Sequence, residues 1–167
     1  PAGPQGSWLQ PVPLIRLDRA PGAALSVQMN GTALPIQLGE NATLALRLPG
    51  DMAIGAAPMV FAGFGVVAGG HDPYAGVDVA GKVVLLLAGD PDGEAGADLG
   101  FEGRRLTYAG RVGIKMAAAA KAGAVGAIVL HEDFAASYPL AQLVGTERVA
   151  QMVPGATTFG GAFRFAS

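Results

Sequence analysis

Two patterns of apolar positions divide the chain. In the first third, short extended runs such as residues 11–19 and 23–29 alternate with turn residues. The dipeptide Asn30-Gly31 follows the second run, and because both central positions of a type I′ turn need positive φ, it predicts a β-hairpin. Gly39-Glu40-Asn41 predicts the next turn, before a further extended run at residues 42–48.

From residue 57 onward the apolar residues form continuous runs instead. The runs are residues 57–67 (APMVFAGFGVV), 83–89 (VVLLLAG) and 126–130 (GAIVL). Strands that are buried on both faces lose the alternation of apolar and polar residues, because neither face meets water. These runs therefore predict the strands of a central sheet.

A helical period appears between the second and third runs. Apolar residues recur at i, i+4 spacing, and the basic residues of this stretch fall mostly off their line. The apolar line comprises Val112, Met116, Ala120 and Ala124, and the basic residues are Arg111, Lys115 and Lys121. This pattern predicts a helix over about residues 110–122 with a mainly alanine buried face. Gly123 supplies the left-handed residue that typically ends a helix.

Composition narrows the class of protein. The 167 residues fit one domain, and 51% apolar against 14% charged residues indicate a compact or partner-covered fold. The formal net charge of -2 and the lack of a Lys/Arg cluster disfavour nucleic acid and anionic membranes as partners. There is no Cys, which excludes disulfides, Cys-ligated zinc and thiol catalysis. The chain opens on PAGPQGSW without Met, so we expect an excised fragment or a mature product.

Two glycine patterns come close to nucleotide-binding motifs. Residues 76–82 (GVDVAGK) fit the start of a phosphate-binding loop, but Val83 stands where a hydroxyl belongs, and a predicted strand follows where that loop needs a helix. We interpret this stretch as a turn at Ala80-Gly81 that leads into a strand. Residues 63–68 (GFGVVA) match a dinucleotide fingerprint, again without the following helix, and are interpreted as a bend or a close backbone approach. A small-ligand or nucleotide-binding α/β module resting on these patterns stays as the alternative function.

The titratable residues form no complete catalytic set. His71 and His131 are far apart in sequence, and His131-Glu132-Asp133 is the cluster at a predicted strand end. Metal binding there is weighed against a hydrogen bond from His131 to a neighbouring loop, which we favour. No Ser lies in a G-x-S-x-G motif. Four Asp lie in turn-rich stretches, where such residues usually bond their own backbone, namely Asp72, Asp78, Asp90 and Asp92. We assign no catalytic, cofactor-binding or metal-ligating residue.

Two long stretches resemble a known domain family. They are residues 59–92, which contain DPYAGVDVAGKVVLL, and residues 104–144, which contain TYAGRVGIKMAAAAKAGAVGAIVLHE. Both resemble the protease-associated (PA) domain of secreted zinc aminopeptidases of the aminopeptidase Y and glutamate carboxypeptidase type. Residues 1–17 are similar to the segment that leads from the catalytic domain of such enzymes into the PA insertion. The resemblance spans residues 1 to about 144, and it leaves residues 145–167 unplaced.

The resemblance implies a fold and a division of the chain. The expected fold is α+β and β-rich, a PA-type open β-sandwich or barrel with flanking helices that include the helix at about 110–122. Residues 1–22 would lead in from the peptidase domain, residues 23–150 would form the PA domain, and residues 151–167 would return toward the peptidase domain. An inserted domain also predicts that the N- and C-terminal regions lie near each other.

The resemblance implies a non-catalytic role beside a peptidase. The zinc of such enzymes belongs to the peptidase domain, so no cofactor is expected in these residues. The expected partners are the peptidase domain of the same chain and a peptide substrate, with no nucleic acid and no membrane. The expected location is extracellular or periplasmic. Arg104, Tyr108 and Arg111 are the candidates for a surface that faces the peptidase domain or its substrate, and the competing interpretation is a solvated region before a helix. The high apolar fraction also predicts exposed hydrophobic surface at a domain contact.

Overall fold

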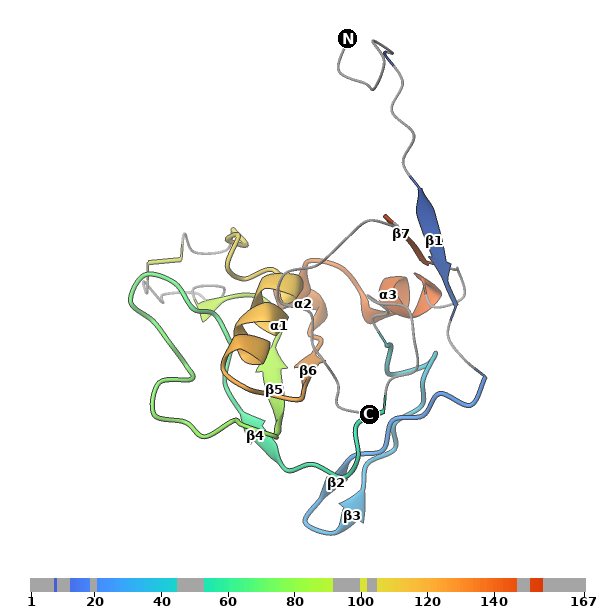
Figure 1. The fold of residues 1–167 in the computed structure, drawn as a ribbon, viewed down its shortest axis with the longest axis horizontal. Helices are drawn as coiled ribbons and strands as arrows, with labels where there is room; N and C mark the ends of the chain where they lie inside the picture. Colours follow the sequence, from blue (N-terminus) through green and yellow to red (C-terminus); the bar gives the residue numbers. More distant parts are fainter. Residues whose placement is uncertain are drawn as a thin grey trace. The chain divides into compact units, whose positions relative to one another are not determined.

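The protein was analysed as a computed structural model that describes residues 8, 13–18, 21–44, 53–91, 100–101, 105–146 and 151–154 (Figure 1). The chain divides into two compact units. Unit 1 comprises residues 1–50 and 141–159, and unit 2 comprises residues 51–140 and 160–167. These units reflect how the chain packs, and the division into residues 1–22, 23–150 and 151–167 stays a prediction.

Unit 1 contains two small antiparallel pairs. Strand β1 (Leu14–Leu17) pairs with β7 (Gln151–Pro154) in a register that sets Leu14 opposite Pro154. This pairing joins a segment near the start of the chain to one near its end, as expected for an inserted domain. Strands β2 (Gln28–Met29) and β3 (Thr32–Ala33) form the second pair.

The turn between β2 and β3 has the predicted geometry. Asn30 has φ 52 and Gly31 has φ 77, so both central residues lie in the left-handed region that a type I′ turn requires. The predicted turn at residues 39–41 is also present. The predicted run at 42–48 lies mostly outside the described residues, and the part that is described, residues 42–44, contributes only an isolated bridge between Leu38 and Ala42.

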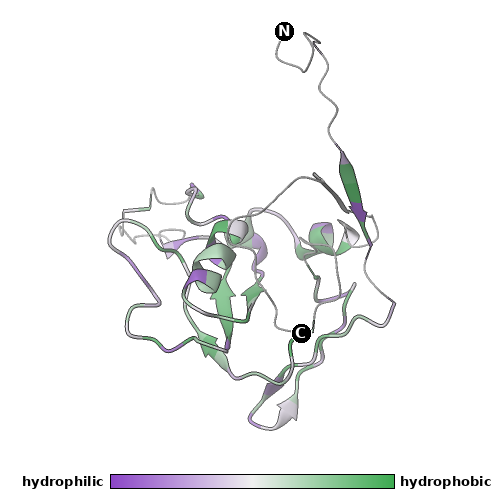
Figure 2. Cartoon of the chain, viewed as in Figure 1, coloured by the Kyte–Doolittle hydropathy of each residue, from purple (hydrophilic) through white to green (hydrophobic). Residues whose placement is uncertain are grey.

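Unit 2 is built on a three-stranded parallel sheet in the order β4-β5-β6. The strands are β4 (Met59–Phe61), β5 (Val83–Leu87) and β6 (Gly126–Leu130), which confirms the sheet predicted from the three apolar runs. Val83 of β5 pairs with both Met59 and Gly126, so β5 is the central strand. Figure 2 shows that these strands are mostly hydrophobic.

Helix α1 (Val112–Lys121) connects β5 to β6 and packs against β6. It lies within the predicted range of 110–122, and Gly123 follows it with φ 100, as predicted. Two short helices come after β6, namely α2 (Asp133–Ala136) and α3 (Leu140–Thr146). The described residues therefore form a mixed α+β fold with short strands and short helices, and they contain no closed barrel.

The buried face of α1 differs from the predicted one. The fully buried positions are Lys115 and Ala119, one residue before the predicted line through Met116 and Ala120. Alanines occupy four consecutive positions of this helix, so the apolar period did not define a single face. Lys115, one of the basic residues placed mostly off the apolar line, is therefore a buried residue of this helix.

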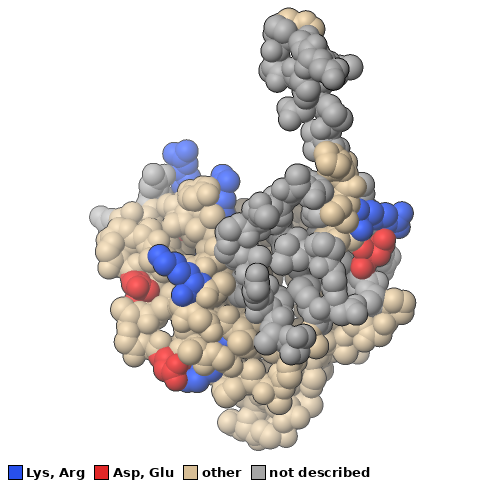
Figure 3. All heavy atoms as spheres, viewed as in Figure 1, with Lys and Arg blue, Asp and Glu red and all other residues tan. Residues whose placement is uncertain are grey.

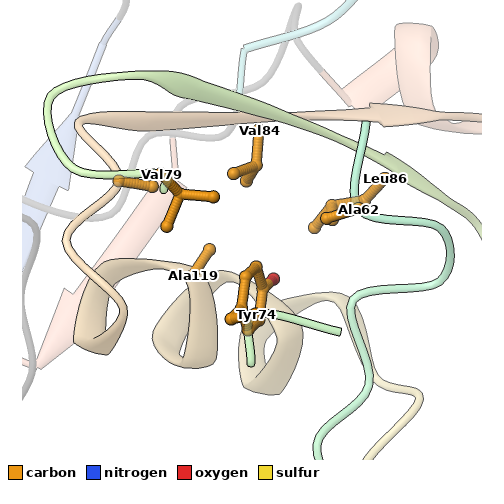
Figure 4. Close-up of a cluster of buried hydrophobic side chains, with 7 residues drawn as sticks. Ala62, Tyr74, Val79, Val84, Leu86 and Ala119 are labelled. Carbon is orange, nitrogen blue, oxygen red and sulfur yellow. The ribbon is translucent and has the colours of Figure 1, made fainter. Parts of the chain in front are cut away.

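The core of unit 2 lies between the sheet and α1 (Figure 4). Val84 and Leu86 alternate along β5 toward this core and are fully buried, and they face Ala119 and Tyr74. The small side chain of Ala119 lets the helix approach the sheet closely. The remaining members of the cluster are Ala62, Val79 and Ala124.

We expect Leu86→Ala to lower the free energy of unfolding by about 2–5 kcal/mol, because it leaves a cavity in a fully buried site. Urea unfolding followed by circular dichroism measures this loss. Leu130→Ala is the matched control, since Leu130 is 46% exposed and its truncation should cost much less. Equal losses in the two variants would show that β5 is not the centre of the core.

Candidate functional site

Two of the three predicted contact residues lie together before helix α1. Tyr108 is 68% exposed, and Arg111 is an exposed residue at the N-cap position of α1. The guanidinium carbon of Arg111 lies 5.4 Å from the centre of the Tyr108 ring, which is a cation–π contact. Arg104 lies outside the described residues. The structure thus presents an aromatic ring and a cation side by side on the surface.

A buried carboxylate holds this loop to the sheet. Asp90 follows β5 and is only 3% exposed, and its Oδ2 accepts a hydrogen bond from the backbone N–H of Thr107 at 2.9 Å. The Thr107 hydroxyl in turn accepts from the Gly110 N–H at 3.2 Å. A Cβ at Gly110 would lie 2.9 Å from Asp90 Oδ2, so glycine is needed for this close approach. We call residues 105–111 the anchored loop.

Lys115 reinforces the same end of the sheet from helix α1. Its side chain is fully buried, its Nζ donates to the carbonyl of Leu87 at 2.8 Å, and it lies 5.8 Å from the centre of the Phe64 ring. Burial lowers the pKa of Lys115 from 10.5 to about 8, and the negative charge of Asp90 partly opposes this change. The end of β5 is therefore fastened to the anchored loop by Asp90 and to α1 by Lys115.

Sequence reasoning missed both of these buried residues. Asp72 and Asp78 close local turns as predicted, because their carboxylates accept from the N–H groups of Tyr74 at 2.9 Å and Ala80 at 3.2 Å. The same expectation was wrong for Asp90, whose partner is seventeen residues away in sequence. Its position directly after a buried strand was the available signal. Asp92 lies outside the described residues.

The backbone N–H groups of Gly81 and Lys82 donate hydrogen bonds within the protein. The Gly81 N–H donates to Gly123 O and the Lys82 N–H donates to Val79 O, each at 3.1 Å. Lys82 Nζ bonds both the carboxylate and the carbonyl of Asp78, at 3.0 and 2.9 Å. Strand β5 begins at the next residue, which confirms the predicted turn into a strand. This geometry gives no support to a phosphate site here.

The second glycine pattern also leads to no helix. Residues 62–82 contain turns and an isolated bridge between Ala68 and His71, and no helix. Gly65 has φ 65, and a Cβ there would lie 2.6 Å from Leu86 Cδ2 and 3.0 Å from the Tyr74 hydroxyl. The prediction of a close backbone approach is confirmed at Gly65, since a larger residue would displace core side chains.

His131 is bonded to the loop that follows it. Its Nε2 lies 2.9 Å from the carbonyl of Tyr138 and 3.2 Å from Asp133 Oδ1, and the rings of His131 and Tyr138 are 5.2 Å apart. Asp133 Oδ1 also accepts the N–H of Leu140 at 3.0 Å. The predicted hydrogen bond to a neighbouring loop is confirmed. Among the residues that the structure describes, no group of three His, Cys, Asp or Glu could hold a metal ion.

One face of the parallel sheet is apolar and partly exposed. By register, Met59 and Phe61 of β4 lie on the same face as Leu87 of β5 and Leu130 of β6, opposite the face that carries Val84 and Leu86. Met59 is 38%, Phe61 59% and Leu130 46% exposed. We call this the outer sheet face. It matches the predicted exposure of hydrophobic surface.

Charged side chains cover a small part of the described surface in the view of Figure 3, and some of them form ion pairs, as Arg16 does with Asp18. Figure 3 shows Lys and Arg side chains interspersed with Asp and Glu, and most of the described surface carries neither. Within the described part of the chain, no helix has the length and apolar character needed to cross a membrane.

Comparisons with known proteins assign no family to this chain. No protein-family model, curated protein or solved structure matches it.

We expect Asp90→Ala to lower the free energy of unfolding by about 1.5–3 kcal/mol, because it leaves the Thr107 N–H without its charged acceptor. Amide hydrogen exchange should become faster throughout the anchored loop. Asp78→Ala is the control, since it removes a carboxylate from an exposed turn and should leave exchange in the loop unchanged. Unaltered protection of Thr107 in Asp90→Ala would contradict the proposed anchor.

Because the pKa of Lys115 is lowered in the folded chain, we expect the free energy of unfolding to rise with pH above about pH 8. Between pH 8 and 10.5 the unfolded chain holds a proton on Lys115 that the folded chain has released, so the free energy of unfolding increases with pH. The full effect is up to about 3 kcal/mol. Burial, together with the charge of Asp72, raises the pKa of Tyr74 above 10.0, so Tyr74 acts in the opposite direction above that pH. The rise is therefore measured between pH 8 and 10.

Urea unfolding at several pH values tests this expectation. Lys115→Met keeps the aliphatic bulk and removes the titrating group, so the rise should disappear. Lys121→Met changes an exposed lysine of the same helix and should leave the rise in place. If the free energy of unfolding still rises with pH in Lys115→Met, another group causes the rise.

Proposed function

We propose that this chain is a non-catalytic PA-type domain of a zinc-dependent aminopeptidase. It contributes substrate recognition or gating, or contacts with the peptidase domain, and zinc belongs to that other domain. The proposal rests on the sequence resemblance over residues 1–144 together with the surface features of unit 2. An extracellular or periplasmic location is part of the same proposal.

The observation that carries the proposal is the anchored loop. An exposed Tyr108–Arg111 pair on a loose loop would lose conformational entropy on binding any partner. Here the backbone immediately before Tyr108 is tied to a buried carboxylate through the Thr107 N–H, so part of that entropy has been lost during folding. Tyrosine and arginine are also among the residue types that are enriched in strong contacts at interfaces. A rigid loop with these two side chains exposed suits recognition of a peptide.

The outer sheet face supports the second part of the proposal. Apolar side chains that remain exposed on a sheet are typical of contacts with another protein surface. Met59, Phe61 and Leu130 lie on this face, away from the core beneath α1. A contact with a neighbouring domain would remove them from water and add hydrophobic stabilisation.

The pairing of β1 with β7 fits a domain inserted into a host. Both connections to the host would leave from adjacent strands, so insertion would require little distortion of the host domain. No described observation favours the alternative of a nucleotide-binding module, because the backbone donors of Gly81 and Lys82 are already bonded.

Peptide binding tests the recognition role. We expect unblocked peptides to shift the NMR signals of the anchored loop, and Tyr108→Ala or Arg111→Ala to weaken binding roughly five- to thirtyfold, equivalent to contacts of about 1–2 kcal/mol. Both side chains are exposed, so the variants should fold like the unmodified chain. Lys121→Ala, at the other end of α1, is the control and should bind normally. Normal binding by all three variants would remove the loop from the recognition surface.

A catalytic assay tests the non-catalytic part of the proposal. The chain is incubated with aminoacyl-nitroanilides and added zinc, and release of nitroaniline is followed by absorbance. We expect no turnover above a zinc-only control. Zinc-dependent turnover that is retained after purification to homogeneity would overturn the proposal.

A further inference from the structure

The tip of the β2–β3 hairpin brings together the features of a reactive asparagine. Asn30 is exposed and is followed by Gly31, and both residues have positive φ. A Cβ built at Gly31 would meet no atom within 4 Å, so the space around this peptide bond is open. We propose that Asn30 is a site of spontaneous covalent modification, by cyclisation with the Gly31 nitrogen, that yields aspartate and isoaspartate at this position.

The chemistry needs only water. The backbone nitrogen of Gly31 gives up its proton and attacks Asn30 Cγ, a C–N bond forms, and the side-chain nitrogen leaves as ammonia. The product is a five-membered succinimide that joins the two residues. Water then adds to one of its two carbonyl carbons and breaks one C–N bond, which gives either aspartate or isoaspartate. The net change is hydrolysis of one amide, with no oxidation or reduction.

The local structure leaves both reacting groups available. Within the described part of the chain, no residue hydrogen-bonds the Asn30 carboxamide, and the Gly31 N–H has no backbone acceptor. Glycine has no side chain to obstruct the attack. Strands β2 and β3 have only two residues each, all of them exposed, so the turn can open at low cost and bring the nitrogen to Cγ.

A second asparagine in the same unit provides the contrast. Asn41 Oδ1 accepts the N–H of Gln37 and its Nδ2 donates to the carbonyl of Pro35, each at 2.7 Å. The nitrogen that would have to attack belongs to Ala42, and it donates to Gln37 O at 3.3 Å. At Asn41 both the electrophile and the nucleophile are held by the fold. Folding should therefore protect Asn41 and leave Asn30 reactive.

Isoaspartate would change the hairpin that contains it. It adds a methylene group to the main chain of a turn that has only two residues between its strands. A type I′ turn cannot accommodate this extra atom while keeping Met29 opposite Thr32. Modification would therefore separate β2 from β3 while leaving the core of unit 2 unaffected.

The test compares the folded chain with the same chain in urea. Both samples are incubated at mildly alkaline pH, and peptide mapping by mass spectrometry follows the small net mass gain that results when ammonia is lost and water is added. We expect the rates of Asn30 conversion to aspartate and isoaspartate in the folded chain and in urea to differ by no more than a few-fold. Asn41 should convert at least about tenfold more slowly in the folded chain than in urea, because its two hydrogen bonds must break first.

Two further measurements complete the test. Labelling by an isoaspartyl methyltransferase should mark position 30 in the aged folded chain. Asn30→Gly keeps a residue that tolerates positive φ and removes the carboxamide, so labelling at this position should vanish while β2 and β3 stay paired. The proposal is overturned if folding slows Asn30 as strongly as Asn41, or if Asn30 stays unmodified in the folded chain while it converts in urea.

Discussion

The arrangement of unit 2 depends on how two buried charged residues are satisfied at the end of strand β5. Asp90 and Lys115 are both removed from water, and removing a charge from water is costly unless hydrogen bonds compensate for it. Asp90 accepts the N–H of Thr107, and Lys115 donates to the carbonyl of Leu87. The first bond joins the segment just after β5 to the anchored loop, and the second joins the last residue of β5 to helix α1, so these three parts are fixed in one arrangement.

This arrangement separates the residues of the core from the exposed residues of the anchored loop. The core between the sheet and α1 is apolar and buried, and the surface candidates Tyr108 and Arg111 contribute little to it. The exposed residues are connected to the buried Asp90 over a short distance along the chain. The Thr107 N–H is hydrogen-bonded to Asp90, and Tyr108 is the residue after Thr107. Substitutions at the surface can therefore change binding without unfolding the domain, whereas substitutions at Asp90 affect both.

Hydrogen bonding also distinguishes similar residues in unit 1. Asn30 and Asn41 both lie in predicted turns, and both turns form. The carboxamide of Asn41 supplies hydrogen-bond partners for the Pro35 carbonyl and the Gln37 N–H, so it is part of the turn. Asn30 is used only for its tolerance of positive φ, which leaves its side chain unbound. The same residue type is thus structural in one turn and chemically available in the other.

The sequence by itself determined the elements whose causes are local. The three apolar runs became the parallel sheet, Asn30-Gly31 became a type I′ turn, and α1 formed within the predicted range, because periodicity and φ preferences act over a few residues. Of the candidate contact site, the sequence supplied Tyr108 and Arg111 but not the contact between them. Only the tertiary structure decided that Lys115 and Ala119 face the core and that Asp90 reaches Thr107. The burial of Lys115 and Ala119 depends on which side of an alanine-rich helix packs against the sheet. The Asp90–Thr107 bond depends on contact between segments that are distant in sequence. Neither produces a periodic pattern in the sequence.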